Sequence, residues 1–324
     1  MRVSVVIPCH NEEENVGRCI ESVLRCEYDE VEIIVVDDGS TDGTPEICRT
    51  YVDKNLIKYL RRSERGGPAK AINVGAKAAS GSLITVLSAD SLAPYDWLRK
   101  AAKTFLSDKN VMAVGGPLKA SVKSYWALCG EKLDRLLLGP RLRVSPLLGT
   151  NMFVRSDVLR TLGFFKDNLG VGEDLDLSLR LRSYSKRAGG RIVFDRDLVV
   201  FTDYPATLWN AAKRHFWWGK GRSRVLLKSG KWEMKAWLRV LYVPSIVSLA
   251  LATLLSSKVW LVAWAFILSL TGVVAAPMLV LASRLMTESN RECASPSEFL
   301  GLVVLAYVRV ISGSVGSFLA LFRR

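Results

Sequence analysis

The N-terminal part of the chain alternates between short apolar runs and segments with helical periodicity. Apolar runs rich in β-branched residues occur at positions 3–8, 31–36 and 83–87, and they lack the strict polar alternation of a half-exposed strand. Such runs are typical of parallel strands that are covered on both faces. After the first run, apolar residues recur at helical spacing, and Asn11, followed by three glutamates, is expected to cap that helix. The pattern predicts an α/β fold with a mostly parallel central sheet.

Acidic residues follow two of these strands. Asp37 and Asp38 come directly after the second strand, and Asp90 closely follows the third. In an open α/β sheet, ligands bind beyond the carboxyl ends of the strands, so these carboxylates are expected at the mouth of a site. An ordinary turn is the alternative for the first pair, because Thr44 before Pro45 makes a good N-cap and first helical residue.

A basic loop with two glycines precedes another predicted helix. Arg65 and Lys70 flank Gly66 and Gly67 at the point where helical spacing resumes. Glycines beside a helix N-terminus, together with basic side chains, suit a diphosphate. A solvated connection between two elements has the same composition and is the alternative.

The composition narrows the class of protein. The chain of 324 residues carries a formal net charge of +14, which favours an anionic partner. Its six cysteines include no C-x-x-C pair and it has only two histidines, which argues against a zinc site or a disulfide framework. The sequence opens on a predicted strand and not on a signal peptide, so we expect the N-terminal half in the cytoplasm.

The C-terminal part has the hydropathy of a membrane protein. Uncharged apolar runs at 240–256 and 259–283 are long enough to span a bilayer, and 299–322 is a third candidate that contains Arg309. A charge within such a segment is expected to face protein or a lipid phosphate. The sequence thus predicts a multi-pass protein of the cell membrane.

A basic and aromatic segment precedes the first of these spans. Residues 213–239 contain nine basic residues and one acid, with four tryptophans between them. This composition suits either nucleic acid or an anionic lipid surface. The adjoining spans favour the lipid surface, so residues 226–239 are interpreted as a membrane-surface collar, and no nucleic-acid partner is expected.

Four segments in a fixed order resemble one enzyme family. VSVVIPCHNEEENV, VVDDGSTDGT, RGGPAKAINVGAKAASGSLITVLSAD and GEDLDLSLRLRS are similar to the motifs of family 2 glycosyltransferases, whose GT-A fold is a Rossmann-like nucleotide-diphospho-sugar transferase domain. The resemblance covers residues 1–225, and it leaves 226–239 as the collar and 240–324 as the membrane region. It implies inverting transfer of a sugar from a nucleotide diphosphate donor, assisted by Mg²⁺ or Mn²⁺.

The resemblance also assigns the donor site. Asp38 matches the acid that contacts the base, and Asp90 matches the last acid of the family's Asp-X-Asp motif, which holds the metal. Ser88 stands where the first acid of that motif is usual, so Asp90 and the substrate phosphates would hold the cation. The expected donor-binding residues are Pro8, His10, Glu12, Asp38, Arg65, Lys70 and Asp90.

The acceptor side is expected at a second acidic segment. Glu173 and Asp174 precede a predicted helix, where acids are also favoured as simple caps. The resemblance assigns Asp174 as the general base that takes a proton from an acceptor hydroxyl, with Glu173 beside it as a second catalytic acid. A weaker match to the family's Q-x-x-R-W segment assigns Arg214 and Trp217 or Trp218 to a loop near the acceptor and the diphosphate.

These observations leave three functions open. The preferred hypothesis is transfer from a UDP- or GDP-sugar to a hydroxyl of a lipid-linked saccharide or growing polysaccharide, because a hydroxyl needs a base such as Asp174. A polyprenyl-phosphate (dolichyl-phosphate) sugar synthase is the alternative, favoured by the basic collar and by Arg309. The third is a sugar-nucleotide-binding membrane protein without activity, which Ser88 would permit.

Overall fold

The computed structural model describes residues 1–138, 149–228 and 295–320, and the chain divides into two compact units. The first unit comprises Met1–Val122 and Pro140–Asp203, and the second comprises Lys123–Gly139 and Tyr204–Arg324. A segment from the middle of the sequence therefore groups with the C-terminal part. The division expected from the sequence, at residues 225 and 239, stays a prediction.

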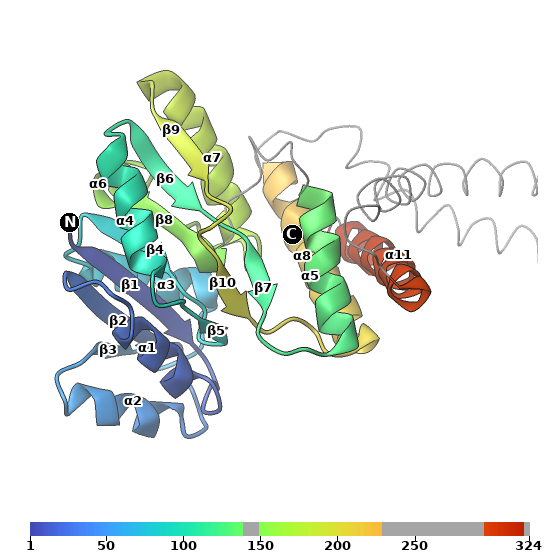
Figure 1. The fold of residues 1–324 in the computed structure, drawn as a ribbon, viewed down its shortest axis with the longest axis horizontal. Helices are drawn as coiled ribbons and strands as arrows, with labels where there is room; N and C mark the ends of the chain where they lie inside the picture. The colour runs from blue at the N-terminus through green and yellow to red at the C-terminus, as the bar shows by residue number, and fades with distance from the viewer. Residues whose placement is uncertain (139–148, 229–294, 321–324) are drawn as a thin grey trace, which may run out of the picture. The chain divides into compact units, whose positions relative to one another are not determined.

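A seven-stranded sheet forms the middle of the first unit (Figure 1). The strands lie in the order β3 (Lys58–Arg61), β2 (Val31–Asp37), β1 (Val3–Cys9), β4 (Leu83–Val86), β8 (Met152–Arg155), β6 (Val111–Gly115) and β9 (Arg191–Phe194). Neighbouring strands are parallel throughout, except that β8 is antiparallel to both β4 and β6. The predicted α/β fold with a mostly parallel sheet is confirmed.

Helices cover both faces of this sheet, which explains the continuous apolar strands. Along β1, Val5 and Ile7 pack into one buried cluster, whereas Val6 packs into another on the opposite face. Because both faces are buried, a strand gains from apolar residues at every position. The helices that contribute to the first cluster are α1 (Val16–Leu24), α2 (Thr44–Val52) and α4 (Trp97–Ser107), and those that contribute to the second are α3 (Pro68–Ala78), α6 (Ser156–Thr161) and α7 (Glu173–Ala188).

A small sheet of three strands completes the first unit. Its strands lie in the order β5 (Ser91–Leu92), β10 (Val200–Thr202) and β7 (Leu118–Ala120). β10 is antiparallel to β5, with Thr202 opposite Ser91. This pairing brings a late part of the unit beside the segment that directly follows Asp90.

Two helix starts differ from the expected ones. Asn11 does not cap the first helix, because α1 begins at Val16, and Asn11 has a positive φ of 56°. Its side-chain oxygen instead accepts a hydrogen bond from the backbone N–H of Thr41 at 2.9 Å. Thr44 is the first residue of α2 and not its N-cap, and its hydroxyl accepts from the backbone N–H of Glu12 at 2.8 Å. Both polar side chains join the loop after β1 to the turn after β2.

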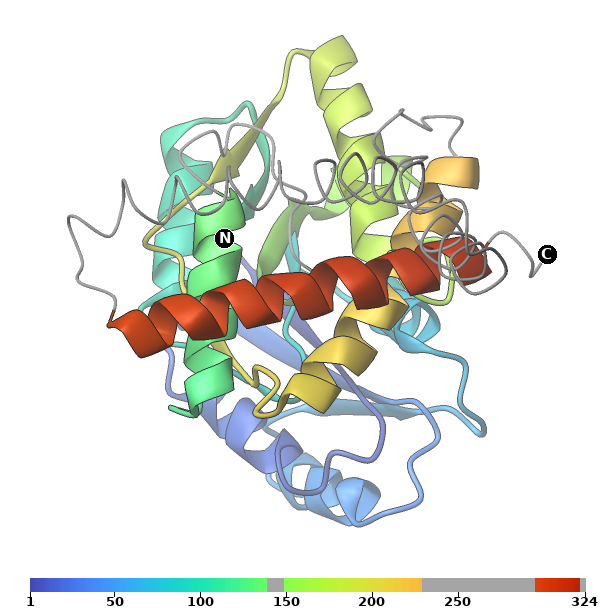
Figure 2. The ribbon, with the colours of Figure 1, turned by 90° about the vertical axis from the view of Figure 1, so that its right-hand side faces the viewer.

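Three helices form the described part of the second unit. Figure 2 shows α11 (Pro296–Leu319) crossing α5 (Tyr125–Leu138) and α8 (Leu208–Lys228). The backbones of α11 and α8 are in contact where the helices cross. A Cβ atom added at Gly219 would overlap the carbonyl oxygen of Gly313. A buried apolar cluster joins the helices: Cys129, Leu133, Ala211, Leu302, Leu305 and Ala306.

One helical stretch among the described residues has the length and composition of a membrane span. It is Leu300–Leu319, which has 20 residues and a mean hydropathy of 1.8 and falls within the third span that the sequence predicts. Its charged residue, Arg309, pairs with Asp134 of α5, so the charge faces protein. The predicted spans at 240–256 and 259–283, and most of the collar at 226–239, lie outside the described residues.

Candidate active site

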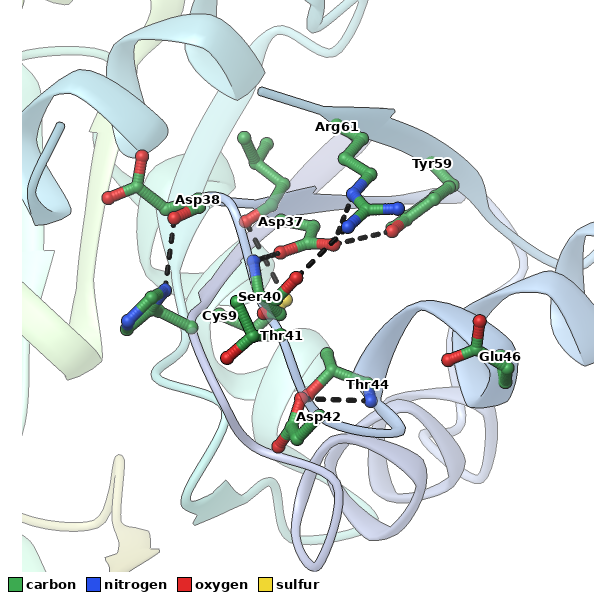
Figure 3. Close-up of polar contacts among 12 residues, drawn as sticks. Cys9, Asp37, Asp38, Ser40, Thr41, Asp42, Thr44, Glu46, Tyr59 and Arg61 are labelled. Atoms are coloured by element: carbon green, nitrogen blue, oxygen red, sulfur yellow. Dashed lines mark hydrogen bonds and ion pairs between the residues drawn. The ribbon is translucent and has the colours of Figure 1, made fainter. Parts of the chain in front are cut away.

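The turn after β2 is built around the buried carboxylate of Asp37. This carboxylate accepts hydrogen bonds from the backbone N–H of Ser40 at 2.8 Å and from the hydroxyl of Tyr59 at 2.6 Å, and it pairs with Arg61 (Figure 3). Burial and the Asp37 charge raise the pKa of Tyr59, so the phenol stays a donor. The contacts of Asp37 all shape the turn.

Asp38 holds a different loop. Its carboxylate is almost fully buried and accepts hydrogen bonds from the backbone N–H groups of Gly66, at 3.0 Å, and Gly67, at 2.7 Å. The guanidinium of Arg62 also pairs with it. Gly67 has φ of 92°, a conformation that favours glycine, and α3 begins at the next residue. Asp38 therefore positions the glycine loop at the start of α3, and its expected contact with the nucleotide base stays a prediction.

Two carboxylates line one small pocket, and a third carboxylate, that of Glu12, is close enough to feel their charges. Asp90 and Asp203 line it, together with Asn15, Arg18 and Ser121. Burial raises the pKa of Glu12, and the nearby charges of Asp90 and Asp203 raise it further, although a hydrogen bond from Asn15 opposes the rise. The structure thus brings Glu12 and Asp90 together, as expected, and adds Asp203.

A chain of contacts joins the end of β4 to the start of α7. Thr150 Oγ1 accepts a hydrogen bond from the backbone N–H of Ser88 at 3.0 Å, and the two hydroxyls also contact each other. The preceding residue, Gly149, donates its N–H to Asp174 at 3.4 Å. Both belong to the short 3-10 helix Gly149–Asn151. Asp174 is thereby tied to the strand whose end carries Asp90.

Glu173 and Asp174 form a half-buried acidic pair. Burial, and to a smaller extent the charge of Asp174, raise the pKa of Glu173 to about 7. Burial also raises the pKa of Asp174, while the backbone N–H groups of Leu175, at 2.7 Å, and of Gly149 stabilise its charged form. Glu173 Oε2 is buried and has no hydrogen-bond partner in the structure. A carboxyl group whose pKa lies near 7 can take up or release a proton at physiological pH.

The other expected donor-site residues divide into two groups. His10 Nδ1 lies 3.0 Å from the carbonyl oxygen of Asp38, and Pro8 pairs with Val36 in the sheet, so both are at the carboxyl end of β1. Arg65 and Lys70, by contrast, are exposed on the loop and on the first turn of α3. Their assignment to the diphosphate stays a prediction.

The aromatic residues expected near the acceptor belong to the second unit. Arg214 of α8 stacks over the ring of Trp218, with 4.5 Å between guanidinium carbon and ring centroid, and also over Tyr204 at 5.3 Å. Trp217 lies on the same helix and its side chain is 51% exposed. The assignment of these three residues to the acceptor side stays a prediction.

The pocket around Asp90 suits a hard divalent cation that is also bound by substrate. Within residues 1–138, 149–228 and 295–320, no three His, Cys, Asp or Glu side chains are grouped closely enough to hold a metal by themselves. Mg²⁺ and Mn²⁺ prefer carboxylate and phosphate oxygens, and Mg²⁺ is usually held by one or two carboxylates plus substrate phosphates. The donor set present, with Asp90 at its centre, fits that mode of binding.

Two residues of this region were not assigned from the sequence. Asp203 follows a short strand whose pairing partner cannot be read from its own pattern, and Arg62 is one of several basic residues in its loop. One feature of the sequence points to Asp203, because it closely follows an apolar run at 198–201, as Asp90 follows the run at 83–87. Only the strand pairing places Asp203 beside Asp90.

Comparisons with known proteins identify the family. The family model for "Glycosyl transferase family 2" matches residues 4–161, and the one for "Glycosyl transferase family group 2" matches residues 83–286. The glycosyltransferase AglE of Haloferax volcanii is 30% identical over 231 residues, covering 69% of this chain and 73% of AglE. The poly-beta-1,6-N-acetyl-D-glucosamine synthase of Staphylococcus aureus is 27% identical over 254 residues, and the match covers 74% of this chain but 59% of that enzyme.

Solved structures share the fold at low sequence identity. The mannosyltransferase PcManGT from Pyrobaculum calidifontis, solved with GDP-Man and Mn²⁺, has a TM-score of 0.61 and 22% identity, covering 98% of this chain and 86% of its own. Residues 1–349 of S. aureus TarS, solved with UDP-GlcNAc, have a TM-score of 0.52 and 20% identity, covering 70% of this chain and 67% of theirs. As its ordered motifs predict, this chain belongs to glycosyltransferase family 2 and has the GT-A fold.

Proposed function

We propose that this protein is an inverting glycosyltransferase that moves a hexose from a UDP- or GDP-sugar to a hydroxyl of a lipid-linked saccharide or a growing polysaccharide. The observation that supports the proposal is the half-buried pair of Glu173 and Asp174, tied to the end of β4 through Gly149 and Thr150. A hydroxyl must lose its proton as it attacks, whereas a phosphate is already anionic. A positioned base therefore favours a hydroxyl acceptor.

Asp174 is the proposed general base. Its raised pKa makes the carboxylate a stronger proton acceptor, and the backbone N–H groups of Gly149 and Leu175 fix its orientation. The acceptor proton passes to Asp174 while the acceptor oxygen bonds to C1 of the sugar and the bond from C1 to the diphosphate oxygen breaks. Attack opposite the leaving group gives inversion at C1.

The donor is proposed to lie across the carboxyl ends of β1, β2 and β4. Glu12, Asp38 and Asp90 come from those three strand ends, and Asp38 orients the glycine loop before α3. A Mg²⁺ or Mn²⁺ ion held by Asp90 and the donor phosphates would neutralise charge on the leaving diphosphate. GDP-Man and UDP-GlcNAc in the structural neighbours support a donor of the same chemical class.

We also propose that the protein acts at the cell membrane as a multi-pass protein with its catalytic unit in the cytoplasm. The apolar stretch Leu300–Leu319 supports attachment, as do exposed tryptophans of α8 with lysines over their rings. Lys213 lies over Trp209, whose side chain is 68% exposed, at 5.3 Å. Paired basic and aromatic side chains suit the interface between lipid head groups and water.

A two-step experiment tests this function. Purified full-length protein in detergent is first screened by thermal shift against UDP- and GDP-sugars, because a bound donor raises the melting temperature. The donors found are then labelled in the sugar and incubated with membranes that supply lipid-linked and polysaccharide acceptors. We expect label in a glycolipid or polysaccharide, with free nucleoside diphosphate as the co-product.

Two other results would contradict the proposal. Label transferred to added polyprenyl phosphate, and to no hydroxyl acceptor, would assign the polyprenyl-phosphate sugar synthase instead. Donor binding without transfer or hydrolysis with any acceptor would assign a nucleotide-sugar-binding protein without activity.

A further inference from the structure

Asp203 directly follows β10, and Asp90 directly precedes β5, the strand that pairs with β10. In the antiparallel register of β10 and β5, Phe201 is opposite Leu92 and Thr202 is opposite Ser91. Asp203 and Asp90 are the residues next to this last pair, one on each segment. Directly opposed residues in such a pair have Cβ atoms about 5 Å apart, and Asp203 and Asp90 adjoin the pair Thr202 and Ser91.

Neighbouring carboxylates repel each other, and a bound cation relieves this repulsion. Both line the same pocket, and their charges together help to raise the pKa of Glu12. The pocket lining includes one basic residue, Arg18. Asp203 is solvent exposed, so a ligand can reach it, and Ser121 donates a hydrogen bond to its carboxylate. The pocket has the charge of a site for a cation.

The carboxylate of Asp90 is oriented by neighbouring hydroxyls. The Ser91 hydroxyl contacts Asp90 Oδ1 at 3.1 Å and Thr202 Oγ1 at 2.9 Å. The hydroxyl of Ser88, by contrast, contacts Thr150. Position 88, where the family usually has an acid, therefore offers no carboxylate and has its hydroxyl engaged elsewhere.

We propose that Asp203 supplies the second carboxylate of the divalent-cation site, in the place that Ser88 leaves without one. Asp90 and Asp203 would each give one oxygen, and the donor diphosphate and water would complete the coordination, as hard cations prefer. This inference rests on the proposed function, because the cation is the one that would assist departure of the diphosphate. The inference goes beyond the proposed function because it assigns a metal ligand, Asp203, from the C-terminal end of the first unit.

The test measures how strongly Mn²⁺ promotes nucleotide binding, without any turnover. Calorimetry on the full chain gives Kd for UDP and GDP with and without Mn²⁺, for the wild type and for Asp203→Asn. We expect the factor by which Mn²⁺ tightens nucleotide binding to be smaller in the variant than in the wild type by about tenfold or more. The matched control is Asp53→Asn, at the end of α2, which should keep the wild-type enhancement of nucleotide binding by Mn²⁺. Asp203→Ser is a second variant, in case the amide side chain perturbs folding.

A rescue experiment sharpens the result. The double variant Ser88→Asp/Asp203→Asn should recover the enhancement, because it places a carboxylate at the family's usual position. An enhancement that is unchanged in both Asp203 variants would overturn the inference, as would wild-type nucleotide binding that is equally tight without Mn²⁺. In either case, sugar transfer by the wild type under the same conditions would leave the proposed function standing, whereas its absence would count against that function separately.

Discussion

The carboxylate of Asp38 accepts a hydrogen bond from the backbone N–H of Gly67 at 2.7 Å, across 29 positions of the sequence. This contact fixes the loop between β3 and α3 against the end of β2. Gly66 donates to the same carboxylate, and Arg62 pairs with it. Asp38 therefore contributes to folding of the loop, whatever its contact with a donor.

Replacing Asp38 with Asn should destabilise the protein. In either orientation the N–H₂ group of the amide would face a donor, the N–H of Gly67 or the guanidinium of Arg62, so one donor would lose its acceptor. We expect a loss of about 1–3 kcal/mol in the free energy of unfolding, measured by urea denaturation. Asp29→Asn, at an exposed position, serves as the control. Equal urea midpoints for the two variants would show that the contacts of Asp38 contribute nothing to stability.

Replacing Asp174 with Asn should abolish transfer and leave donor binding intact. Asparagine keeps the size of the side chain but cannot accept the acceptor's proton, so the rate should fall by about 10²–10⁴-fold. Transfer of labelled sugar gives the rate and calorimetry gives the Kd for the donor. Asp167→Asn, which changes an exposed acid before α7, is the control. An unchanged transfer rate would refute the assignment of Asp174 as the base.

Replacing Glu173 with Gln should stabilise the protein at alkaline pH. Burial raises the pKa of Glu173 from 4.5 to about 7, so the folded state binds more protons than the unfolded state between those values. The stability of the wild type therefore falls as pH rises through this window, and the loss is complete above about pH 7. Glutamine has no charge to bury and escapes this loss.

The comparison at two pH values isolates this effect. The advantage of Glu173→Gln over the wild type should be about 3 kcal/mol larger at pH 8 than at pH 4.5, as a difference in the free energy of unfolding from urea denaturation. Glu14→Gln, an exposed change on the loop before α1, should show no such pH dependence. If the two variants behave alike, the pKa of Glu173 is not raised.

Replacing only one partner of the Arg309–Asp134 ion pair should destabilise the protein more than replacing both partners. The pair joins α11 to α5, both side chains are less than one third exposed, and the hydroxyl of Tyr204 also contacts Asp134 at 3.3 Å. Arg309→Met alone leaves the carboxylate unpaired, so we expect a cost of about 1–2 kcal/mol, whereas Asp134→Leu/Arg309→Met together should cost less.

Thermal unfolding of the full chain in detergent measures this double-mutant cycle. Arg99→Met breaks an exposed pair with Glu27 in the first unit and should change stability by less than about 0.5 kcal/mol. Additive effects of the two changes in the cycle would mean that Arg309 and Asp134 do not interact energetically.

The sequence by itself determined the central sheet and the position of two acids at its edge. Residues 33–36 are apolar at every position because both faces of this parallel strand are buried, so the residue types themselves indicate a buried strand. Asp38 and Asp90 follow such strands, so their place at the carboxyl ends follows from the strand assignment. The ordered motifs then indicated the family.

Tertiary structure alone decided the partners of polar side chains. Asn11 has the residue type of an N-cap, but its oxygen accepts from Thr41 of the next turn. Asp203 joins Asp90 only because β10 pairs with β5, which places Thr202 beside Ser91 although they are 111 positions apart. A hydrogen-bonding side chain can satisfy itself with any nearby donor or acceptor, so its local sequence does not specify which one. The fold chooses the partner by bringing distant segments together, and the chemistry of the pocket follows from that choice.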